Sequence, residues 1–373
     1  MERSGVTPRT SVVSPELTEL VAAPGPFATV YLTTESAVDN AAYHSEQRWR
    51  SLRGELAEAG ATEEILGAVD PLVPDAHQEG KCLGVVAGAG ILHVEHDADP
   101  PRRDMVRWAT LPSLVPLLEW RQARPPHVVV VTDRRGADLV VVRRELPDVQ
   151  REAGGADDPI ARSSPGGWSQ RRFQERAENT WEHNADDVAR EITRLAMATA
   201  ARLVVVAGDV RAVQLLRDAL PEEVATIVEV VPGSRSVDSS FGGIADDVAA
   251  AVEAAVAADT DALLAKFREE LGQADRAVDG AVATLEALAM GRVEVLLVHD
   301  DPDDARTAWF GQEPTQVGAN ADTVAAFGAA PPVEGRLVDV AVAAALRTGA
   351  GIRVVPTPDW PREGLGAILR WGG

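Results

Sequence analysis

An apolar stripe of helical period runs through residues 173–199 and constrains the fold more strongly than any other feature of this 373-residue chain. Its members recur every three or four positions, which places them on one face of an α-helix: Phe173, Ala177, Trp181, Ala185, Val188, Ile192, Leu195 and Thr199. A helix over 169–200 would be roughly 48 Å long at 1.5 Å per residue. Such a helix has to bury its apolar face against another layer of structure.

Short apolar runs flank this helix on both sides. The elements expected around it are strands at 127–132 and 138–143 before the helix, then a strand at 203–207, a helix at 209–219 and a strand at 225–231. This alternation predicts an α/β layer. Residues 145–168 show no periodicity and carry Gly, Pro, Asp and Ser throughout, so we expect a structureless loop of a length that is usually functional or disordered.

The chain is long enough for several domains, and three are expected: 1–124, 125–272 and 273–373. Pro125-Pro126 marks the first boundary. The elements expected in the first domain are a strand at 27–33, a helix at 40–59, a hairpin within 81–96 and a helix at 113–123. Those expected later are helices at 244–271, 275–290, 321–327 and 337–348, with strands at 293–298 and 352–355.

Composition excludes several classes of protein. The sequence has no run of about 18 apolar residues, so we expect no membrane span. It has no apolar signal core near its start, so we do not expect secretion. Cys82 is the only cysteine, so an intrachain disulfide and a cysteine-based zinc site are excluded. We therefore expect a cytoplasmic protein.

The net charge of −22 argues against a general nucleic-acid binder, because that affinity comes from neutralising phosphates. The charge is unevenly distributed, however. Residues 101–144 hold nine arginines against four acids, a local excess of five positive charges, and residues 161–180 hold four arginines against two glutamates. Contact with RNA is therefore expected only through arginine-rich segments.

The start of the long helix combines a glycine pair with an arginine cluster. Gly166 and Gly167 precede the helix, Arg171 and Arg172 fall in its first turn, and Arg176 follows one turn later. Cations at a helix N-terminus usually cost roughly 0.3–1 kcal/mol, because that terminus is already partly positive. Exposed N–H groups and arginines together make an anion site. We interpret this segment as a tip that contacts RNA phosphates.

A structural alternative explains part of the same motif. Ser169 is a good N-cap residue, and Trp168 and Phe173 would then occupy the positions of a hydrophobic staple. The tryptophan would in that case pack on the first turn of its own helix. A second arginine pair, Arg134-Arg135, lies between the first two strands and is either a solvated turn or a second phosphate contact.

The remaining motifs favour structural roles over metal or cofactor binding. His93, Glu95 and His96 lie in an expected strand and lack the spacing of a helical zinc site. The acidic residues 299–304 follow a strand, where carboxylates need no metal. The chain has no Walker loop and no nucleophile elbow, so neither a metal nor a cofactor is predicted. His183-Asn184 is expected to be a polar pair on the helix surface.

The order of these features resembles the middle domain of archaeal and eukaryotic class-1 release factors and Pelota. A strand, Asp-Arg-Arg-Gly-Ala, a second strand, a long loop, a Gly-Gly motif and a long helix follow one another. The residues that match the family's loop and helix start are Gly166, Gly167, Ser169, Arg172, Phe173 and Arg176. Residues 261–298 resemble the linker helix and the entry to the third domain, and residues 364–371 resemble the family's C-terminal ending.

The resemblance implies a three-domain, release-factor-like α/β architecture. The first domain would be α/β and face the decoding centre, the middle domain would carry the Gly-Gly-Trp loop and the long helix, and the third would have an L7Ae/L30-like α/β fold. The likeness covers 125–373 well and 1–124 in general outline. The chain also resembles the bacterial members of this family, including the Balon-type ribosome hibernation factors.

One departure from the family pattern concerns the chemistry. Release factors carry Gly-Gly-Gln, and the region of this glutamine places water against the peptidyl-tRNA ester, whereas this chain has Trp168 at that position. An indole offers one donor and no carbonyl acceptor, so it cannot replace the amide. Gln170 lies two residues further on, inside the expected helix, and is a poor substitute. Residues 1–124 also lack an Asn-Ile-Lys-Ser stop-codon motif. The expectation is therefore a protein without catalytic residues.

The resemblance further implies partners and a role. A tRNA-shaped factor would occupy the A site of idle or stressed 70S ribosomes, touching rRNA of the A site and of the peptidyl-transferase centre and reaching the mRNA channel. The residues expected to contact the ribosome are Gly166, Gly167, Trp168, Ser169, Gln170, Arg171, Arg172, Phe173, Arg176, Arg134 and Arg135. Elongation factor Tu is an expected delivery partner, no membrane partner is expected, and the chain is expected to be a monomer off the ribosome.

Two alternatives stay open on the sequence alone. The chain could be a rescue enzyme that hydrolyses peptidyl-tRNA or cleaves tRNA, with Gln170 or His183 as candidate groups. It could also be a stress-response protein that acts away from the ribosome.

Overall fold

The computed structural model describes residues 15–34, 41–97, 103–133, 135–143, 149–154, 167–234, 241–273, 275–328, 331–356 and 360–372. Contacts divide the chain into two compact units, unit 1 with Met1–Gln122 and Thr260–Gly373, and unit 2 with Ala123–Asp259. Unit 2 therefore interrupts unit 1 in the sequence. The mixed α/β class is confirmed by the sheets and helices of both units, and the division into three domains stays a prediction.

Unit 2 is built on a five-stranded sheet of order β7-β6-β5-β8-β9. Its strands are β5 (His127–Thr132), β6 (Gly136–Val142), β7 (Val149–Gly154), β8 (Leu203–Gly208) and β9 (Val228–Val230). The hairpin strands β5 and β6 pair antiparallel, whereas β8 pairs parallel to both β5 and β9. A parallel pair needs a long crossover, and the long helix α6 provides it between β7 and β8.

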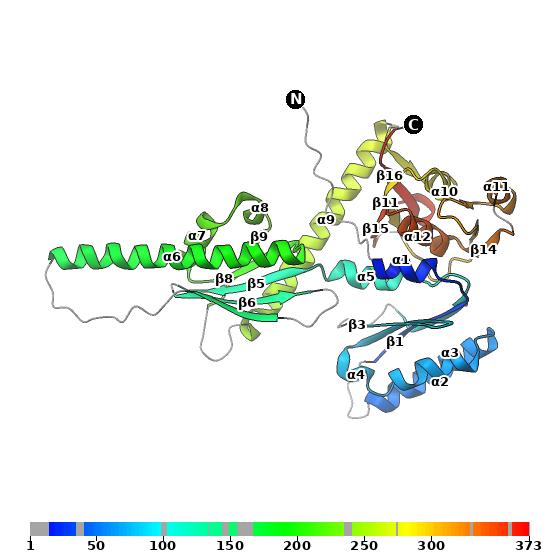
Figure 1. Ribbon diagram of the computed structural model, residues 1–373, viewed down its shortest axis with the longest axis horizontal. Helices are drawn as coiled ribbons and strands as arrows, with labels where there is room; N and C mark the ends of the chain where they lie inside the picture. The colour runs from blue at the N-terminus through cyan, green and yellow to red at the C-terminus, as the bar shows by residue number, and fades with distance from the viewer. Residues whose placement is uncertain are drawn as a thin grey trace. The chain divides into compact units, whose positions relative to one another are not determined.

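Helices cover both faces of this sheet. On one face lie α6 (Gly167–Thr199), α7 (Val210–Ala219) and α8 (Glu222–Ala225), whose apolar side chains share a core with Val128 and Val130 of β5. Figure 1 shows α6 and α7 on one side of the strands. On the other face, residues 245–259 of α9 (Ala245–Gln273), preceded by η2 (Gly242–Ile244), share a core with Val129 and Val131. Because side chains alternate along a strand, β5 supplies both cores and is buried throughout, with four consecutive valines at its centre.

The sequence prediction of unit 2 was wrong in one segment. Strand β7 forms inside the stretch 145–168 that was expected to have no regular structure. It pairs antiparallel to β6 along its whole length, from Val141↔Val149 to Gly136↔Gly154. As an edge strand with polar residues, β7 lacks the apolar alternation that identifies a strand in sequence.

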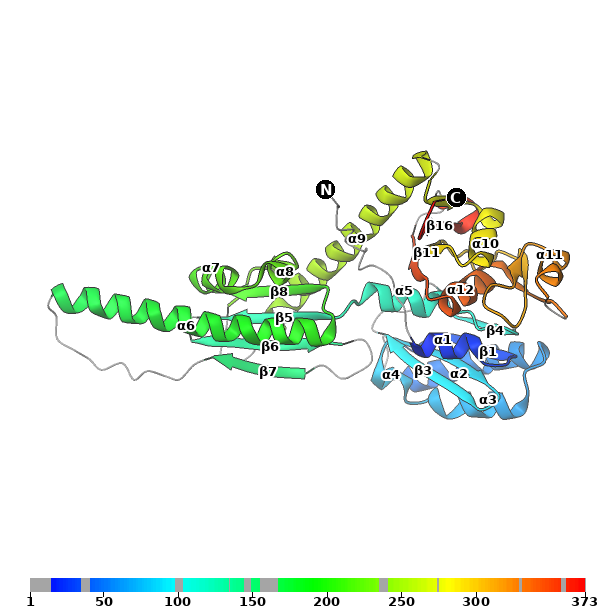
Figure 2. The same cartoon turned by 45° about the horizontal axis from the view of Figure 1, so that its top comes forward.

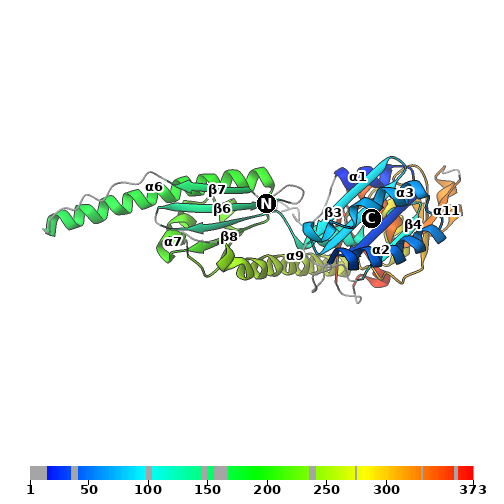
Figure 3. The same ribbon diagram turned by 90° about the horizontal axis from the view of Figure 1, so that it is seen from below.

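The N-terminal segment of unit 1, residues 1–122, carries a four-stranded antiparallel sheet of order β3-β2-β1-β4. Its elements are α1 (Pro15–Ala22), β1 (Phe27–Thr33), α2 (Ala41–Glu58), α3 (Glu63–Val69), η1 (Asp70–Leu72), α4 (Ala76–Glu79), β2 (Cys82–Gly88), β3 (Ile91–Asp97), β4 (Met105–Ala109) and α5 (Val115–Ala123). Helices α2 and α3 pack on one face of this sheet, and α1 and α5 pack on the other. Figure 3, seen from below, shows α2 and α3.

The C-terminal segment of unit 1, residues 260–373, contains a four-stranded sheet of order β10-β16-β11-β15 and a three-stranded sheet of order β13-β12-β14. Its elements are β10 (Ala277–Asp279), α10 (Ala281–Ala289), β11 (Val293–Val298), β12 (Thr307–Phe310), β13 (Val317–Gly318), α11 (Ala321–Ala326), β14 (Val333–Arg336), α12 (Leu337–Arg347), β15 (Gly351–Val354), η3 (Arg362–Gly364) and β16 (Leu365–Leu369). The helix expected at 275–290 is wrong at its start, where β10 pairs with β16.

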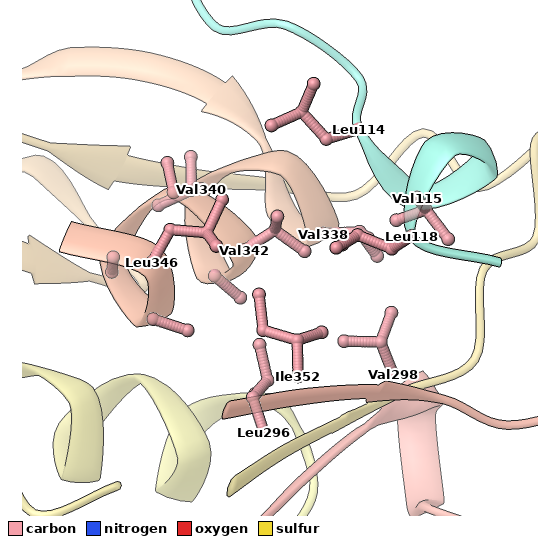
Figure 4. Packing of buried hydrophobic residues seen from close by; sticks show 14 of the residues in the cluster. Leu114, Val115, Leu118, Leu296, Val298, Val338, Val340, Val342, Leu346 and Ile352 are labelled. Carbon is pink, nitrogen blue, oxygen red and sulfur yellow. The ribbon is translucent and has the colours of Figure 1, made fainter. Parts of the chain in front are cut away.

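The two segments of unit 1 share one apolar core. Leu114, Val115 and Leu118 from the N-terminal segment pack with buried residues of α12 such as Val338 (Figure 4). Among the described residues, no helix is long and apolar enough to cross a membrane.

The docking of α6 gives a first prediction. Ile192 of α6 is fully buried between this helix and the sheet. Ile192→Ala should therefore lower the free energy of unfolding by about 2–5 kcal/mol, because apolar burial is lost and a cavity forms. Met197→Ala on the exposed side of the same helix should change it by about 0.5 kcal/mol or less. Urea denaturation followed by circular dichroism measures both. Equal effects of the two substitutions would contradict the packing of α6.

Candidate functional site

The turn between β5 and β6 is fixed by Asp133. Its Oδ1 atom accepts hydrogen bonds from the backbone N–H groups of Arg135, at 2.8 Å, and Gly136, at 3.0 Å. The Asp133 N–H donates to the carbonyl of Gly136 at 2.9 Å, and the Thr132 hydroxyl donates to the same carbonyl at 3.0 Å. Such an aspartate turn presents the intervening residues to solvent. The Arg135 side chain is exposed, and Arg134 lies outside the described residues.

Helix α6 divides into a docked half and a projecting half. The buried positions of its described side chains are Asn184, Val188, Ala189, Ile192, Leu195 and Ala196. The helix leads directly into β8, so it runs antiparallel to β5 and β8 and passes their carboxyl ends with residues 167–183. At 1.5 Å per residue this half extends roughly 25 Å beyond the sheet. Figure 2 shows α6 continuing past the ends of β5, β6 and β7.

The helix begins at Gly167, two positions before the expected N-cap Ser169. Ser169 therefore lies inside the first turn, and the N-cap interpretation is wrong, because the helix already begins at Gly167. Gly166 lies outside the described residues. The structure gives the helical backbone position of the remaining motif residues, which are Trp168, Gln170, Arg171, Arg172, Phe173 and Arg176.

Three parts of unit 2 lie at the same end of the sheet. Thr132 and Gly208 are partners at the carboxyl ends of the parallel strands β5 and β8. The turn of Arg135 follows β5 at this end, and β7 also ends here, with Gly154 opposite Gly136. The first half of α6 projects past the same strand ends. The fold thus brings the exposed Arg135 to the end from which the arginine positions of α6 project.

Asn184 joins the helix to this end of the sheet. The predicted surface pair holds for His183, which is exposed and lies 3.9 Å from the Asp187 carboxylate, but it is wrong for Asn184. Asn184 is buried and lines a small pocket with Thr132, Asp133 and other residues of α6 and α7. A sequence signal existed, since Asn184 lies four positions before Val188 and therefore on the same face of the helix as the apolar stripe.

Glu95, one of the candidate metal ligands of the sequence, forms an ion pair with an arginine. The Glu95 carboxylate accepts hydrogen bonds from Arg121 Nε at 3.1 Å and Nη2 at 2.9 Å, and lies 3.3 Å from His93 Nε2. Burial acts to raise the pKa of Glu95, but its bonds to His93 and Arg121 outweigh burial and leave this pKa below its usual value. Its oxygens are thus engaged in a structural ion pair.

The acidic stretch after β11 is paired in the same way. Three of its carboxylates contact arginines from different segments: Asp300 with Arg336, Asp303 with Arg103 at 2.9 Å, and Asp304 with Arg306 at 2.6 Å. Within the part of the chain that the structure describes, no three His, Cys, Asp or Glu side chains are placed to hold a metal ion. The described groups support neither a metal site at 299–304 nor one at His93.

Part of the chain matches a known protein family. Residues 126–273 match the family model "Bacterial archaeo-eukaryotic release factor family 2". Uncharacterized proteins from two strains of Mycobacterium tuberculosis, CDC 1551 / Oshkosh and ATCC 25618 / H37Rv, are 28% identical over 365 residues, which are 96% of this chain and 96% of each relative.

Several solved structures also align over most of the chain. An archaeal translation termination factor is 16% identical, with 95% of both chains covered and a TM-score of 0.27. Pelota of Archaeoglobus fulgidus is 14% identical, with 95% and 92% covered and a TM-score of 0.35. Archaeal Pelota in a ribosome-bound model is 16% identical, with 97% and 96% covered and a TM-score of 0.41.

Unit 2 is a three-layer α/β unit with a long helix that begins at Gly167. The family match is more specific: residues 126–273 match the model of bacterial archaeo-eukaryotic release factor family 2. The matched range contains the Asp133 turn, the whole of α6 and the whole of α9.

The Asp133 turn gives a second prediction. Asp133→Ala removes the acceptor of two backbone N–H groups and should lower the free energy of unfolding by about 1 kcal/mol. Asp133→Asn keeps an acceptor oxygen at the same position and should retain most of that stability. Thermal denaturation of the full chain distinguishes the two variants. If Asn destabilised as much as Ala, the carboxylate charge rather than the turn geometry would be responsible.

Proposed function

We propose that this chain is a ribosome-binding translation factor that occupies the A site of idle or stressed ribosomes without hydrolysing peptidyl-tRNA. The match of residues 126–273 to a release factor family model supports a role in translation. The observation that carries the proposal is the projecting half of α6, which starts at Gly167 and leaves the sheet at the same end as the Asp133 turn.

The projecting half of α6 resolves a conflict of charge. The chain carries a net charge of −22, so its body repels RNA at long range. A helix that extends roughly 25 Å past the strands carries Arg171 and Arg172 about two Debye lengths from the sheet at physiological salt, and Arg176 more than one. Arginine contacts phosphate in a planar, bidentate manner, so a few such residues can supply the electrostatic attraction. The proposed contact is confined to this tip and the Arg134-Arg135 turn.

The proposed partners rest on the resemblance to release factors and Pelota. The tip would meet rRNA of the peptidyl-transferase centre and the A site of the 70S ribosome, with the N-terminal segment toward the mRNA channel. Elongation factor Tu is the proposed delivery partner, and the free chain is proposed to be a cytoplasmic monomer that uses no cofactor.

The absence of hydrolysis in the proposal rests on Trp168. Its indole has one N–H donor and no acceptor, so it cannot orient a water molecule as a side-chain amide does. Its large aromatic face can stack on a nucleotide base. The residue at the centre of the motif is thus suited to occupying the site and not to activating water.

Charge reversal at the tip tests ribosome binding. Arg171→Glu together with Arg172→Glu should weaken binding to 70S ribosomes at least tenfold at physiological salt and flatten its salt dependence, because two phosphate contacts are lost. The matched control is Arg190→Glu with Arg194→Glu on the docked half of α6, where both arginines pair with acids of their own helix. Co-sedimentation through sucrose measures both variants. Equal binding by the tip variant and the wild type would refute the assigned contact.

A peptide-release assay separates this proposal from the rescue-enzyme alternative. On stalled ribosomes carrying peptidyl-tRNA, the wild-type protein should release no more peptide than buffer, because Trp168 offers no acceptor for water. Intact tRNA on a denaturing gel would exclude tRNA cleavage. Release above background that disappears in Gln170→Ala or His183→Ala would establish the enzyme instead.

A further inference from the structure

A buried carboxylate lies between the two segments of unit 1. Asp339, in the first turn of α12, is 2% exposed. Its Oδ2 atom accepts a hydrogen bond from the Ser113 hydroxyl of the N-terminal segment at 2.8 Å. Its Oδ1 atom accepts no hydrogen bond and lies 3.7 Å from Arg336 Nη1. A buried ionised carboxylate with one hydrogen bond is poorly compensated.

The donor of that single bond is fixed by the N-terminal segment. The Ser113 N–H donates to the Thr29 hydroxyl at 3.3 Å, and the Tyr31 hydroxyl donates to the Ser113 carbonyl at 2.7 Å. Thr29 and Tyr31 belong to β1 and are both buried. The Ser113–Asp339 bond therefore links the centre of one sheet to the start of a helix that lies 226 residues later.

The nearby cation is shared with other acceptors. Arg336 pairs with the Asp300 carboxylate and donates to the carbonyls of Asp301, at 2.6 Å, and Asp304, at 3.3 Å. These bonds draw its charge toward the acidic loop of the C-terminal segment. Arg336 therefore compensates Asp339 only through an ion pair of 3.7 Å without a hydrogen bond.

Charged groups reach Asp339 from both segments. Arg336 and Asp300 lie on the C-terminal side, and Arg107 of β4 and the Tyr31 hydroxyl lie on the N-terminal side. Burial dominates and raises the pKa of Asp339 from 3.8 to about 6, although Arg336, Ser113 and Arg107 all act to lower it. Burial also lowers the pKa of Arg107, whose Nε atom has no hydrogen-bond partner.

We propose that the Asp339 cluster, consisting of Ser113, Asp300, Arg336 and Asp339, makes the joint between the two segments of unit 1 proton-sensitive. One proton taken up by Asp339 tightens the joint, and its release loosens the joint. Protonation removes a buried charge and leaves Arg336 paired with Asp300. The apolar contacts of α5 and α12 hold the segments together in both protonation states. The proton therefore shifts the equilibrium between the closed and the open joint.

The direction of the pH dependence follows from linkage. A carboxyl whose pKa is about 6 in the closed joint and 3.8 in solvent binds a proton as the joint closes. The closed joint is therefore most stable below pH 3.8, loses stability as the pH rises to about 6, and changes little above that value. A gap of about two pKa units corresponds to roughly a hundredfold change in the closing equilibrium. This inference does not depend on the proposed ribosomal role.

Hydrogen exchange of the full-length protein tests the proposal. Protection factors, which correct for the intrinsic effect of pH on exchange, are compared between pH 4.5 and pH 7.5 for amides of α5, residues 115–123, and α12, residues 337–347. In the wild type, protection in both helices should fall by ten- to a hundredfold as the pH rises from 4.5, and it should level off near pH 6. Amides of α7 in unit 2 should show no such fall. Protection of α5 and α12 that does not change with pH would overturn the proposal.

Variants assign the effect to this cluster. Asp339→Asn should abolish the fall in protection, whereas Asp322→Asn, an exposed aspartate of α11, should leave it unchanged. Ser113→Ala removes the one hydrogen bond to the ionised carboxylate and should raise the pH at which protection levels off. The carboxyl carbon of Asp339 in the native protein, followed by NMR, should titrate near pH 6 even if Asp339→Asn fails to fold. Protection that levels off at the same pH in Ser113→Ala as in the wild type, or an Asp339 that titrates below pH 4.5, would refute the assignment.

Discussion

The packing of one half of α6 on the sheet of unit 2 is the interaction on which the candidate site depends. Val188, Ile192 and Leu195 enter the core beside β5 and β8 and fix the direction of the helix. Helix nucleation is the costly step, and a docked half provides the nucleus from which the other half can continue into solvent. The position of Gly167 relative to the Asp133 turn is then set by a rod instead of a flexible chain. An arginine cluster on such a rod loses little entropy on binding.

The same chain handles its charges in two different ways. In unit 1, acidic groups after β11 are paired with arginines from three segments, so much of the acidity serves the fold. In unit 2, the Arg135 side chain is exposed to solvent at the carboxyl end of the sheet. Asp339 stands apart, because it is buried with one hydrogen bond and is therefore the group of unit 1 that is best placed to respond to protons.

Several errors of the sequence prediction share a physical cause. Strand β7 is polar, and β10 is only three residues long, so neither has a period that can be counted. Both exist because a partner strand, β6 in one case and β16 in the other, offers backbone hydrogen bonds. Asn184 was placed on the surface because of its residue type, although its position on the apolar stripe indicates burial. Asp339 lies in a correctly predicted helix, but the serine that contacts it is 226 residues away.

The sequence by itself determined the long helix, the alternation of strands and helices around it, the glycine pair at its start and the presence of Trp168 where a glutamine was expected. These are local properties, because a helix or a buried strand repeats its apolar residues with a fixed period. Only the tertiary structure decided that the Asp133 turn and the projecting half of α6 share one end of a sheet, and that the first and last segments of the chain close around one carboxylate. Both depend on strand pairing and burial between residues that are distant in sequence, which no local pattern encodes.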